Sequence, residues 1–180
     1  MSLYRTTFPS PLGELLAMAS PQGLCLLEFP DGQGLARELR QVEVARAGPA
    51  QPGRNAVLEQ LEPQLAQYFA GQRQVFSVPL DWIGTPFQQR VWQALLAIPY
   101  GQTRSYAEQA RAIGQPTAQR AVAAAHGSNK ISIVVPCHRV IGSNGSLTGF
   151  GGGLPRKQAL LALENGQKDC FPASVHGEKL

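Results

Sequence analysis

The stretch SYAEQARAIGQPTAQRAVAAAHGSN, residues 105–129, decides the fold of the second half of the chain. It predicts one helix, a break at Gly114 and a second helix entered through Pro116, because glycine ends helices and proline suits a first turn. Two helices joined by a turn of about three or four residues with glycine are typical of a helix-turn-helix. An ordinary helical hairpin in a core has the same pattern, so the pattern alone leaves both interpretations open.

The second helix of this stretch has a slim surface with one long cation. That cation is Arg120, and it stands among the small residues Ala118, Ala121, Ala123, Ala124 and Ala125. A usual recognition helix reads the major groove with long polar side chains, which are scarce here. A slim helix suits the minor groove, about 6 Å wide, where it would read shape and backbone. Close packing of the alanines against neighbouring helices is the competing explanation.

Positive charge gathers around the same stretch. The chain carries a formal charge of +4 and an isoelectric point of about 9.2, which permits binding to a polyanion. Between residues 85 and 168 the only acidic residues are Glu108 and Glu164. The basic residues of that segment are Arg90, Arg104, Arg111, Arg120, Lys130, Arg139, Arg156, Lys157 and Lys168. The N-terminal half is close to neutral, so the positive field belongs to the C-terminal half.

Composition excludes several classes of protein. With 43% hydrophobic and 16% charged residues, the chain is expected to fold and not to be disordered. No apolar run approaches the roughly 18 residues of a membrane span, and the N-terminus does not resemble a secretory signal. We therefore expect a cytoplasmic protein with no membrane partner. Its three cysteines lack the spacing of a disulfide framework or a zinc finger, so no metal is expected.

Residues 1–81 are predicted to form a small α/β domain. The expected elements are two strands within 12–29 around a turn at 21–23, helices in 33–42 and 55–71, and a strand in 74–80. Residues 45–55, rich in glycine and proline, are expected to form a loop. Cys25 lies in an apolar run of the second strand, which predicts a packed core residue.

Residues 82–168 are predicted to form the second domain. Its first helix should be capped by Thr85 and hold Pro86 in its first turn. An apolar face made of Phe87, Val91, Leu95 and Ile98 follows at helical spacing, with Trp92 beside it. Residues 169–180 have no clear periodicity and are expected to form a loose tail.

The stretch SIVVPCHRVIG, residues 132–142, raises the question of whether Cys137 reacts. A thiol of pKa about 8.5 is mostly protonated at neutral pH, so it needs a base or nearby positive charge to attack. His138 is adjacent, but neighbouring side chains of a strand point to opposite faces, which calls for a bend after Pro136 or a bridging water. Glu164 is the only carboxylate downstream within the second domain, so it is the candidate to orient the histidine. The residues alone leave a structural role for Cys137 open.

The sequence PCHRV, residues 136–140, resembles the active-site signature of the O6-alkylguanine–DNA alkyltransferases. Three longer segments resemble the family in order and spacing: TPFQQRVWQALLAIPYGQTRSYAE (85–108), AQRAVAAAHGSN (118–129) and IVVPCHRVIGSNGSLTGFGGGLPRKQALLALE (133–164). The resemblance covers about residues 82–166 and is looser before them. It implies an α+β protein, in which a small ribonuclease-H-like α/β domain precedes a mostly helical domain with a helix-turn-helix.

The resemblance also implies an activity, which is DNA repair by direct reversal. A single irreversible step would carry the alkyl group of O6-alkylguanine, and of O4-alkylthymine, from double-stranded DNA to a cysteine of the protein. We expect a monomer without a cofactor and one transfer per molecule, because thiolate leaves a thioether too poorly for water to release it. The alternatives are a non-catalytic alkyl-lesion binding protein, a cysteine hydrolase and a regulatory DNA-binding module. The presence of Cys137 in this chain speaks against a non-catalytic lesion-binding protein.

Carried over position by position, the resemblance assigns catalytic roles. Cys137 would accept the alkyl group, His138 would act as its base through a bridging water, and Glu164 would orient that histidine. Asn129 would brace the turn behind the active site. Tyr106 would hydrogen-bond or protonate the guanine near the flipped nucleotide.

The resemblance assigns DNA and pocket contacts as well. Arg120 would enter the base stack where the damaged base was. The other implied DNA contacts are Ser105, Ala121, Ala125 and Arg139, and the implied pocket residues are Val140, Phe150 and Gly152. Phe150 stands where some relatives have tyrosine, which removes a hydroxyl from the pocket wall. The glycines at 151–153 make that loop more permissive than most, which leaves the tolerance for larger alkyl groups open.

Overall fold

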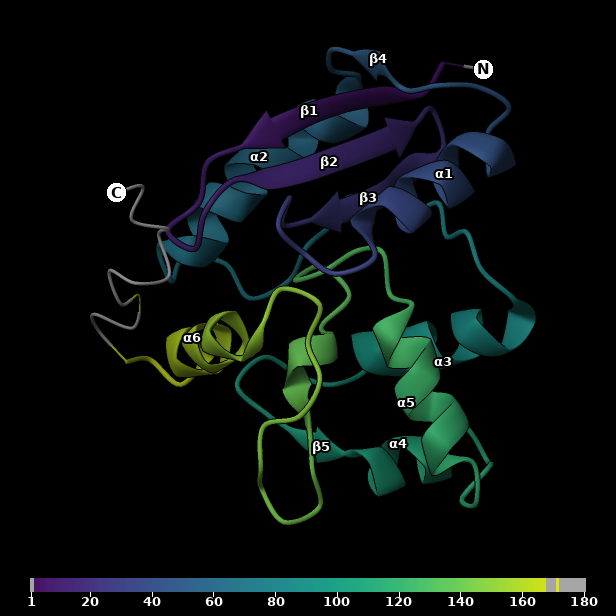
Figure 1. Cartoon of the computed structure of the whole chain (residues 1–180). Coiled ribbons are helices and arrows are strands. Elements are labelled where there is room, and N and C mark those ends of the chain that lie inside the picture. Colours follow the sequence, from purple (N-terminus) through teal and green to yellow (C-terminus); the bar gives the residue numbers. More distant parts are fainter. Residues whose placement is uncertain (1, 168–170, 172–180) are drawn as a thin grey trace.

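The N-terminal half of the chain forms a four-stranded sheet (Figure 1). The computed structural model describes residues 2–167 and 171, so the expected tail over 169–180 lies outside the described residues except at Phe171. The strands are β1 (Tyr4–Phe8), β2 (Leu15–Ser20), β3 (Gly23–Glu28) and β4 (Gln51–Pro52), in the order β3-β2-β1-β4. The first three pair antiparallel, and β4 pairs parallel with β1. The predicted turn at 21–23 joins β2 to β3, while β1 and β4 were not predicted.

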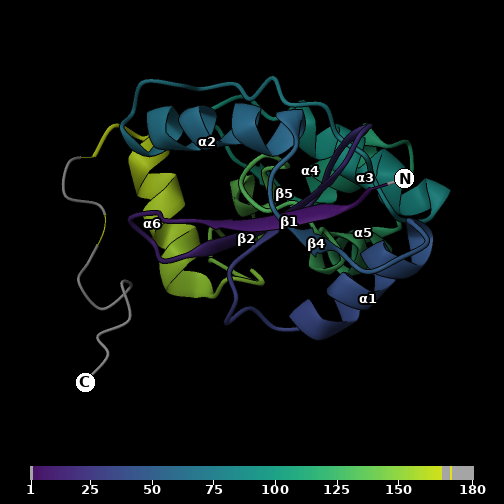
Figure 2. The ribbon, with the colours of Figure 1, turned by 90° about the horizontal axis from the view of Figure 1, so that it is seen from above.

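Two helices cover opposite sides of this sheet (Figure 2). Helix α1 (Leu35–Ala45) packs Val42 against Met18 and Leu26, and α2 (Ala56–Phe69) belongs to the main core on the other side. The Asn55 side chain begins α2 by accepting a hydrogen bond from the Leu58 N–H. Both helices confirm the sequence prediction.

The predicted strand over 74–80 is wrong, because this segment makes only one bridge to the sheet. Leu24 N–H donates to Pro79 O at 2.8 Å, and Asp81 N–H donates to Leu24 O at 2.9 Å. Pro79 has no N–H to extend a ladder, and Ser77 N–H donates instead to the side chain of Gln64. The alternating pattern here reflects packing against α2 and not strand pairing.

The edge of β3 also receives a segment from the second half of the chain. Leu27 N–H donates to Lys130 O at 2.8 Å, and Ser132 N–H donates to Leu27 O at 2.9 Å. This parallel bridge joins the residues before Cys137 to the N-terminal sheet. The placement of the cysteine therefore depends on both halves of the chain.

The second half is mostly helical. Its elements are α3 (Pro86–Leu96), α4 (Tyr106–Ala112), α5 (Gln119–Gly127), the 3-10 helix η1 (Cys137–Arg139), α6 (Leu154–Glu164), and the short parallel strands β5 (Arg104–Ser105) and β6 (Val140–Ile141). Thr85 caps α3 as predicted and shares a capping box with Gln88. None of the described helices is both long and apolar enough to span a bilayer.

The helix-turn-helix consists of α4 and α5, with a longer connection than expected. Helix α5 begins at Gln119, so Pro116 lies in the turn and not in the first helical turn. Gly114, at φ +73°, takes the left-handed conformation that ends α4, which is why a glycine stands there. Trp92 of α3 donates its indole N–H to Ala125 O at 2.8 Å and fixes α5 against the core.

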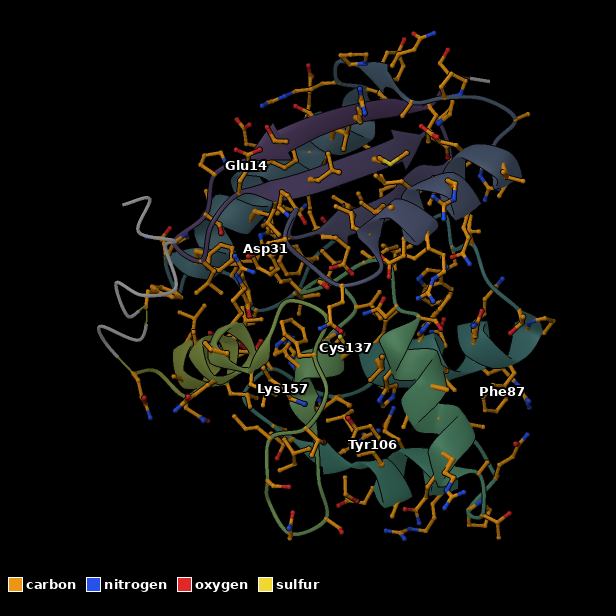
Figure 3. All side chains as sticks on the ribbon, in the orientation of Figure 1. Glu14, Asp31, Phe87, Tyr106, Cys137 and Lys157 are labelled. Carbon is orange, nitrogen blue, oxygen red and sulfur yellow. The ribbon has the colours of Figure 1, made fainter. Side chains whose placement is uncertain are left out.

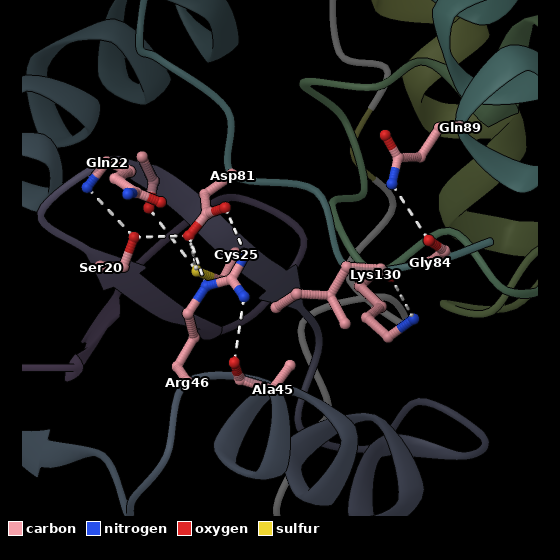
Figure 4. A network of polar contacts seen from close by, with 11 residues as sticks. Ser20, Gln22, Cys25, Ala45, Arg46, Asp81, Gly84, Gln89 and Lys130 are labelled. Carbon is pink, nitrogen blue, oxygen red and sulfur yellow. Dashed lines mark hydrogen bonds and ion pairs between the residues drawn. The ribbon is translucent and has the colours of Figure 1, made fainter. Parts of the chain in front are cut away.

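Asp81 anchors the link between the two halves to the N-terminal sheet (Figure 4). Its carboxylate accepts hydrogen bonds from Ser20 Oγ at 2.6 Å and from Arg46 Nε at 2.7 Å, and a second ion-pair contact comes from Arg46 Nη2. Cys25 lies beside it, with Sγ 3.5 Å from Asp81 Oδ2. Burial, aided by the charge of Asp81, raises the pKa of Cys25 to about 11, so this core thiol is inert.

We expect Asp81→Ala to lower the free energy of unfolding by about 2–3 kcal/mol at pH 7, because it leaves the Arg46 guanidinium unpaired. Burial opposes ionisation of Asp81, but the hydrogen bonds from Arg46 and Ser20 outweigh it and lower the pKa. A lowered folded pKa gives stability that is present above about pH 4 and lost as the pH falls through that pKa. Urea unfolding at pH 7 and pH 3 should show a smaller difference from wild type at pH 3.

Asp31→Ala is the matched control for this prediction. Asp31 also pairs with an arginine, Arg156, but its side chain is 69% exposed, compared with 10% for Asp81. An exposed pair contributes less than about 1 kcal/mol. Equal losses for the two variants would contradict the anchoring role of Asp81.

Candidate active site

Cys137 opens η1, directly after a tight and strained turn. Cys137 N–H donates to Val135 O at 2.8 Å, and Arg139 N–H donates to Pro136 O at 3.0 Å. The chain thus bends after Pro136, as the reactive interpretation of Cys137 required. Ile133 has φ +71°, a left-handed conformation that a β-branched residue rarely adopts. Contacts with the surrounding residues must therefore stabilise this strained backbone conformation.

Asn129 supplies two of those contacts by bridging the turn. Its Nδ2 donates to Val135 O at 3.0 Å, and its Oδ1 accepts from Ile131 N–H at 3.0 Å. The amide therefore ties both ends of the strained segment together, in the place that the family resemblance implied for it. The polar side chain of Asn129 also lowers the pKa of Cys137.

Behind the cysteine, His138 forms a buried pair with Glu164. Its Nε2 lies 2.6 Å from Glu164 Oε2, and neither side chain is more than 1% exposed. Within the described residues, His138 Nδ1 has no hydrogen-bond partner in the protein. Burial would raise the pKa of Glu164, but hydrogen bonds and charge from His138 and Arg139 outweigh it and hold the pKa well below its usual range. The carboxylate is therefore ionised and fixes one nitrogen of the imidazole.

Arg139 corrects a prediction, because it is buried and does not face DNA. Its Nε donates to Glu164 Oε1 at 2.7 Å, and its Nη1 donates to Ile98 O at 2.8 Å. The guanidinium compensates the buried carboxylate, which is the usual condition for burying such a charge. Tyr68 of α2 adds a hydrogen bond from its hydroxyl to Glu164 Oε2 at 2.6 Å, and sequence reasoning missed it.

A pocket of about 440 Å³ opens above Cys137. It is lined by Gln33, Gly34, Arg37, Tyr106, Ala123, His126, Gly127, Cys137, Gly149, Phe150 and Gly151. Tyr106 hydrogen-bonds Thr148 O through its hydroxyl at 3.4 Å, and its ring lies 5.2 Å from that of His126. Figure 3 shows Tyr106, Cys137 and Lys157 gathered beneath the sheet. The pocket has the size and the mixed lining of a small-molecule or single-base site.

Two predicted pocket residues do not line this pocket. Val140 is fully buried, and its carbonyl accepts a hydrogen bond from Lys157. Gly152 packs against Phe29, where an added Cβ would come within 2.8 Å of the ring, so its glycine serves close packing. Gly149 and Gly151 provide the backbone that reaches the pocket, next to Phe150 as predicted.

The N-terminal half contributes an unpredicted wall to the pocket. Gln33, Gly34 and Arg37 come from the loop before α1 and from its first turn. No local pattern marks these residues, since only the docking of the two halves brings them to the cysteine. A larger cavity of about 840 Å³ lies between α1 and α3, but Cys137 does not line it. The smaller pocket is therefore the candidate site.

The outer face of α5 is as slim as the sequence indicated. Arg120, Ala121, Ala123 and Ala124 are exposed on it. Ala125 corrects a prediction, since it is 2% exposed and faces the core, where its side chain has no access to DNA. The exposed alanines thus form the slim surface, whereas Ala125 packs against the core. Ser105 lies at the start of α4 and uses its hydroxyl to cap that helix.

Charges buried around the cysteine act in opposite directions. Burial raises the pKa of Cys137 to about 11, and the charge of Glu28 adds to this, while Asn129 and the ammonium of Lys157 lower it. Lys157 is completely buried, and its Nζ donates to Val140 O and Thr148 O, both at 2.6 Å. Sequence reasoning gave this lysine no role, although its charge acts on the thiol. No metal-binding cluster of His, Cys, Asp and Glu occurs among the described residues.

A helix-turn-helix with a slim exposed face stands beside a pocket that contains one cysteine backed by a buried His–Glu pair. This combination defines a DNA-binding protein that carries its own nucleophile. Comparison with known protein families supports this class. The family model of the 6-O-methylguanine DNA methyltransferase ribonuclease-like domain matches residues 3–82. The family model of the DNA-binding domain of the same methyltransferase matches residues 86–166. The chain belongs to the 6-O-methylguanine DNA methyltransferase family.

Individual relatives are named as methyltransferases that act on methylated DNA. A methylated-DNA–protein-cysteine methyltransferase of Mycobacterium tuberculosis is 62% identical over 112 residues, which span 62% of this chain and 66% of that protein. The Mycobacterium leprae protein of that name is 48% identical over 88% of this chain and 90% of its own length. A crystal structure of Mycobacterium tuberculosis OGT in complex with DNA matches with a TM-score of 0.78 and 43% identity, over 97% of this chain and 98% of that one.

Proposed function

We propose that this protein repairs alkylated double-stranded DNA by transferring the alkyl group of O6-alkylguanine, and of O4-alkylthymine, to Cys137. The observation that carries the proposal is Cys137 at the base of a pocket beside the helix-turn-helix, with His138 and Glu164 behind it. The names of the relatives support the same activity. We also propose that residues 82–168 form the domain that performs this reaction and that residues 1–81 form a supporting domain. The protein is proposed to act in the cytoplasm as a monomer.

The chemistry begins with removal of the Cys137 proton. The free protein holds the thiol protonated, so a base must act when the substrate is in place. His138 Nδ1 is the nitrogen left to take this proton through a water, because Nε2 is bound to the ionised Glu164. The thiolate then displaces guanine from the saturated carbon. A new S–C bond forms as the C–O6 bond breaks, and guanine leaves with the electron pair.

The lesion must leave the duplex to reach this pocket. Flipping a nucleotide out of the stack costs a few kcal/mol. The exposed Arg120 on α5 is placed to enter the vacated stack and offset part of that cost. Tyr106, in the pocket wall, is placed to donate a hydrogen bond or proton to the leaving guanine. The slim face of α5 supports a minor-groove approach, in which Ala121 and Ser105 lie near the DNA backbone.

The product limits each molecule to one reaction. Alkylated Cys137 is a thioether, which water does not cleave under these conditions, so no second step regenerates the thiol. The alternative of a non-catalytic lesion binder is less well supported, because such a protein needs neither Cys137 nor its buried His138–Glu164 pair.

The experiment is an intact-mass measurement of the protein after incubation with a duplex that contains one O6-methylguanine. We expect a gain of one methyl group per molecule, located on the peptide that contains Cys137, and no further gain with excess substrate. Tight binding without any mass gain would overturn the proposal in favour of a lesion sensor. Release of free methanol with turnover would favour a hydrolase.

We expect Lys157→Met to slow methyl transfer by at least about tenfold and to destabilise the fold by about 2–4 kcal/mol. The variant removes a buried ammonium that lowers the pKa of Cys137, and it removes the hydrogen bonds that this ammonium donates to the carbonyls of Val140 and Thr148. Single-turnover rates and urea unfolding measure the two effects. Arg5→Met, which removes an exposed cation from β1, should change neither quantity.

A further inference from the structure

Glu28 is a buried carboxyl group that the mechanism above does not use. It is the last residue of β3 and is 5% exposed. Its Oε1 accepts a hydrogen bond of 3.0 Å from Ser132 Oγ, across the junction between the two halves of the chain. An acidic side chain of the N-terminal sheet thus meets the segment that leads to Cys137.

This contact lies at the start of the strained turn. Ser132 N–H donates to Leu27 O, so both the backbone and the side chain of Ser132 are held by the end of β3. The next residue is Ile133 with φ +71°, and Val134 N–H donates back to Ser132 O at 2.8 Å. Ser132 is therefore a fixed point from which the turn to Cys137 departs. Asn129 holds the turn from within, and Glu28 holds it from the N-terminal sheet.

Several charged groups face this junction. On α1, Glu38 is also buried, and its charge acts on Glu28. Lys130 and Arg37 in turn act on Glu38 from the second half and from α1. The charge of Glu28 reaches Cys137, where Lys157 acts in the opposite sense. The charges of these groups therefore act on one another, and that of Glu28 acts on the thiol.

Glu28 changes its charge within the working pH range. Burial and the charge of Glu38 raise its pKa to about 8, although the hydrogen bond from Ser132 opposes this. Most Glu28 side chains are therefore neutral at pH 7 and negative at pH 9. A negative Glu28 disfavours a second negative charge on Cys137, so its ionisation works against formation of the nucleophile.

We propose that Glu28 is a positioning residue for alkyl transfer, which holds the turn before Cys137 through Ser132 and whose negative charge disfavours the Cys137 thiolate. The inference rests on the proposed role of Cys137 as alkyl acceptor. It makes the N-terminal sheet part of the reactivity of the cysteine and not only a support for the fold.

The test compares single-turnover methyl transfer at pH 7 and pH 9 for wild type and Glu28→Gln. Glutamine keeps the shape and the acceptor oxygen of the neutral acid but cannot ionise. We expect the ratio of the rate at pH 9 to the rate at pH 7 to be about three- to tenfold larger for Glu28→Gln, as a difference of half to one unit in the pKa of Cys137 implies. Ser132→Ala, which removes the hydrogen bond that favours the charged form of Glu28, should move the ratio in the same direction by less.

Two controls keep the outcomes distinct. Glu14→Gln removes an exposed carboxylate of the same domain, far from Cys137 in Figure 3, and should leave the wild-type ratio unchanged. Peptide mapping after each reaction shows whether the methyl group is on Cys137. A wild-type ratio in Glu28→Gln, with methyl still on Cys137, would overturn the inference alone. Methyl on another residue would overturn the proposed function itself.

Discussion

Cys137→Ser is expected to abolish methyl transfer, with a rate at least about 1,000-fold below that of wild type. A serine hydroxyl ionises far less readily than a thiol, so neither His138 nor the charge of Lys157 produces enough alkoxide to displace guanine. Oxygen in place of sulfur is a small change in a half-buried side chain, so folding and lesion binding should persist. Intact mass after incubation with the methylated duplex, together with a gel-shift assay, measures both properties.

Cys25→Ser is the matched control for this variant. Cys25 is also a free thiol, but it is 1% exposed in the core, and its pKa is raised to about 11. Its replacement should leave the gain at one methyl group per molecule. Transfer that persists in Cys137→Ser and disappears in Cys25→Ser would reverse the assignment of the acceptor.

Local patterns predicted the elements that local physics determines. The helix cap at Thr85 and the break at Gly114 each depend on residues within four positions, and the structure contains both. The bend that separates Cys137 from His138 follows from Pro136 in the same way. The residues of the PCHRV segment and Glu164 come together because α6 returns the carboxylate to η1, which the family resemblance implied and spacing alone did not.

Contacts between the two halves of the chain could not be predicted from local sequence patterns. The family resemblance implied that Arg139 contacts DNA, whereas its guanidinium is buried against Glu164 from a distant helix. Gln33 and Arg37 reach the pocket only through docking of α1. The alternation in 74–80 predicted a strand, but pairing depends on which neighbour offers a free edge, and the edge of β3 is shared with residues 130–132. Tertiary context decided each of these cases.

Glu164→Gln is expected to destabilise the protein by about 3–5 kcal/mol and to slow methyl transfer by more than about tenfold. Glutamine has the same shape, but it leaves the buried Arg139 without an anionic partner, and breaking a buried pair has this magnitude. It also removes the charge that holds His138 Nε2, so the imidazole loses its fixed orientation. Urea unfolding and single-turnover kinetics measure the two losses.

The pH dependence of the free energy of unfolding distinguishes the effect of the Glu164 charge from that of side-chain packing. The pKa of Glu164 is lowered in the folded protein, so its contribution to stability is complete above the unfolded value of about 4.3 and is lost as the pH falls below it. Glu164→Gln should therefore lose less stability in acid than wild type. Glu62→Gln, which breaks an exposed pair with Arg54, should cost less than about 1 kcal/mol and keep the wild-type acid profile. A variant of Glu164 with normal kinetics would mean that His138 needs no carboxylate partner, and that Glu164 serves only to compensate Arg139.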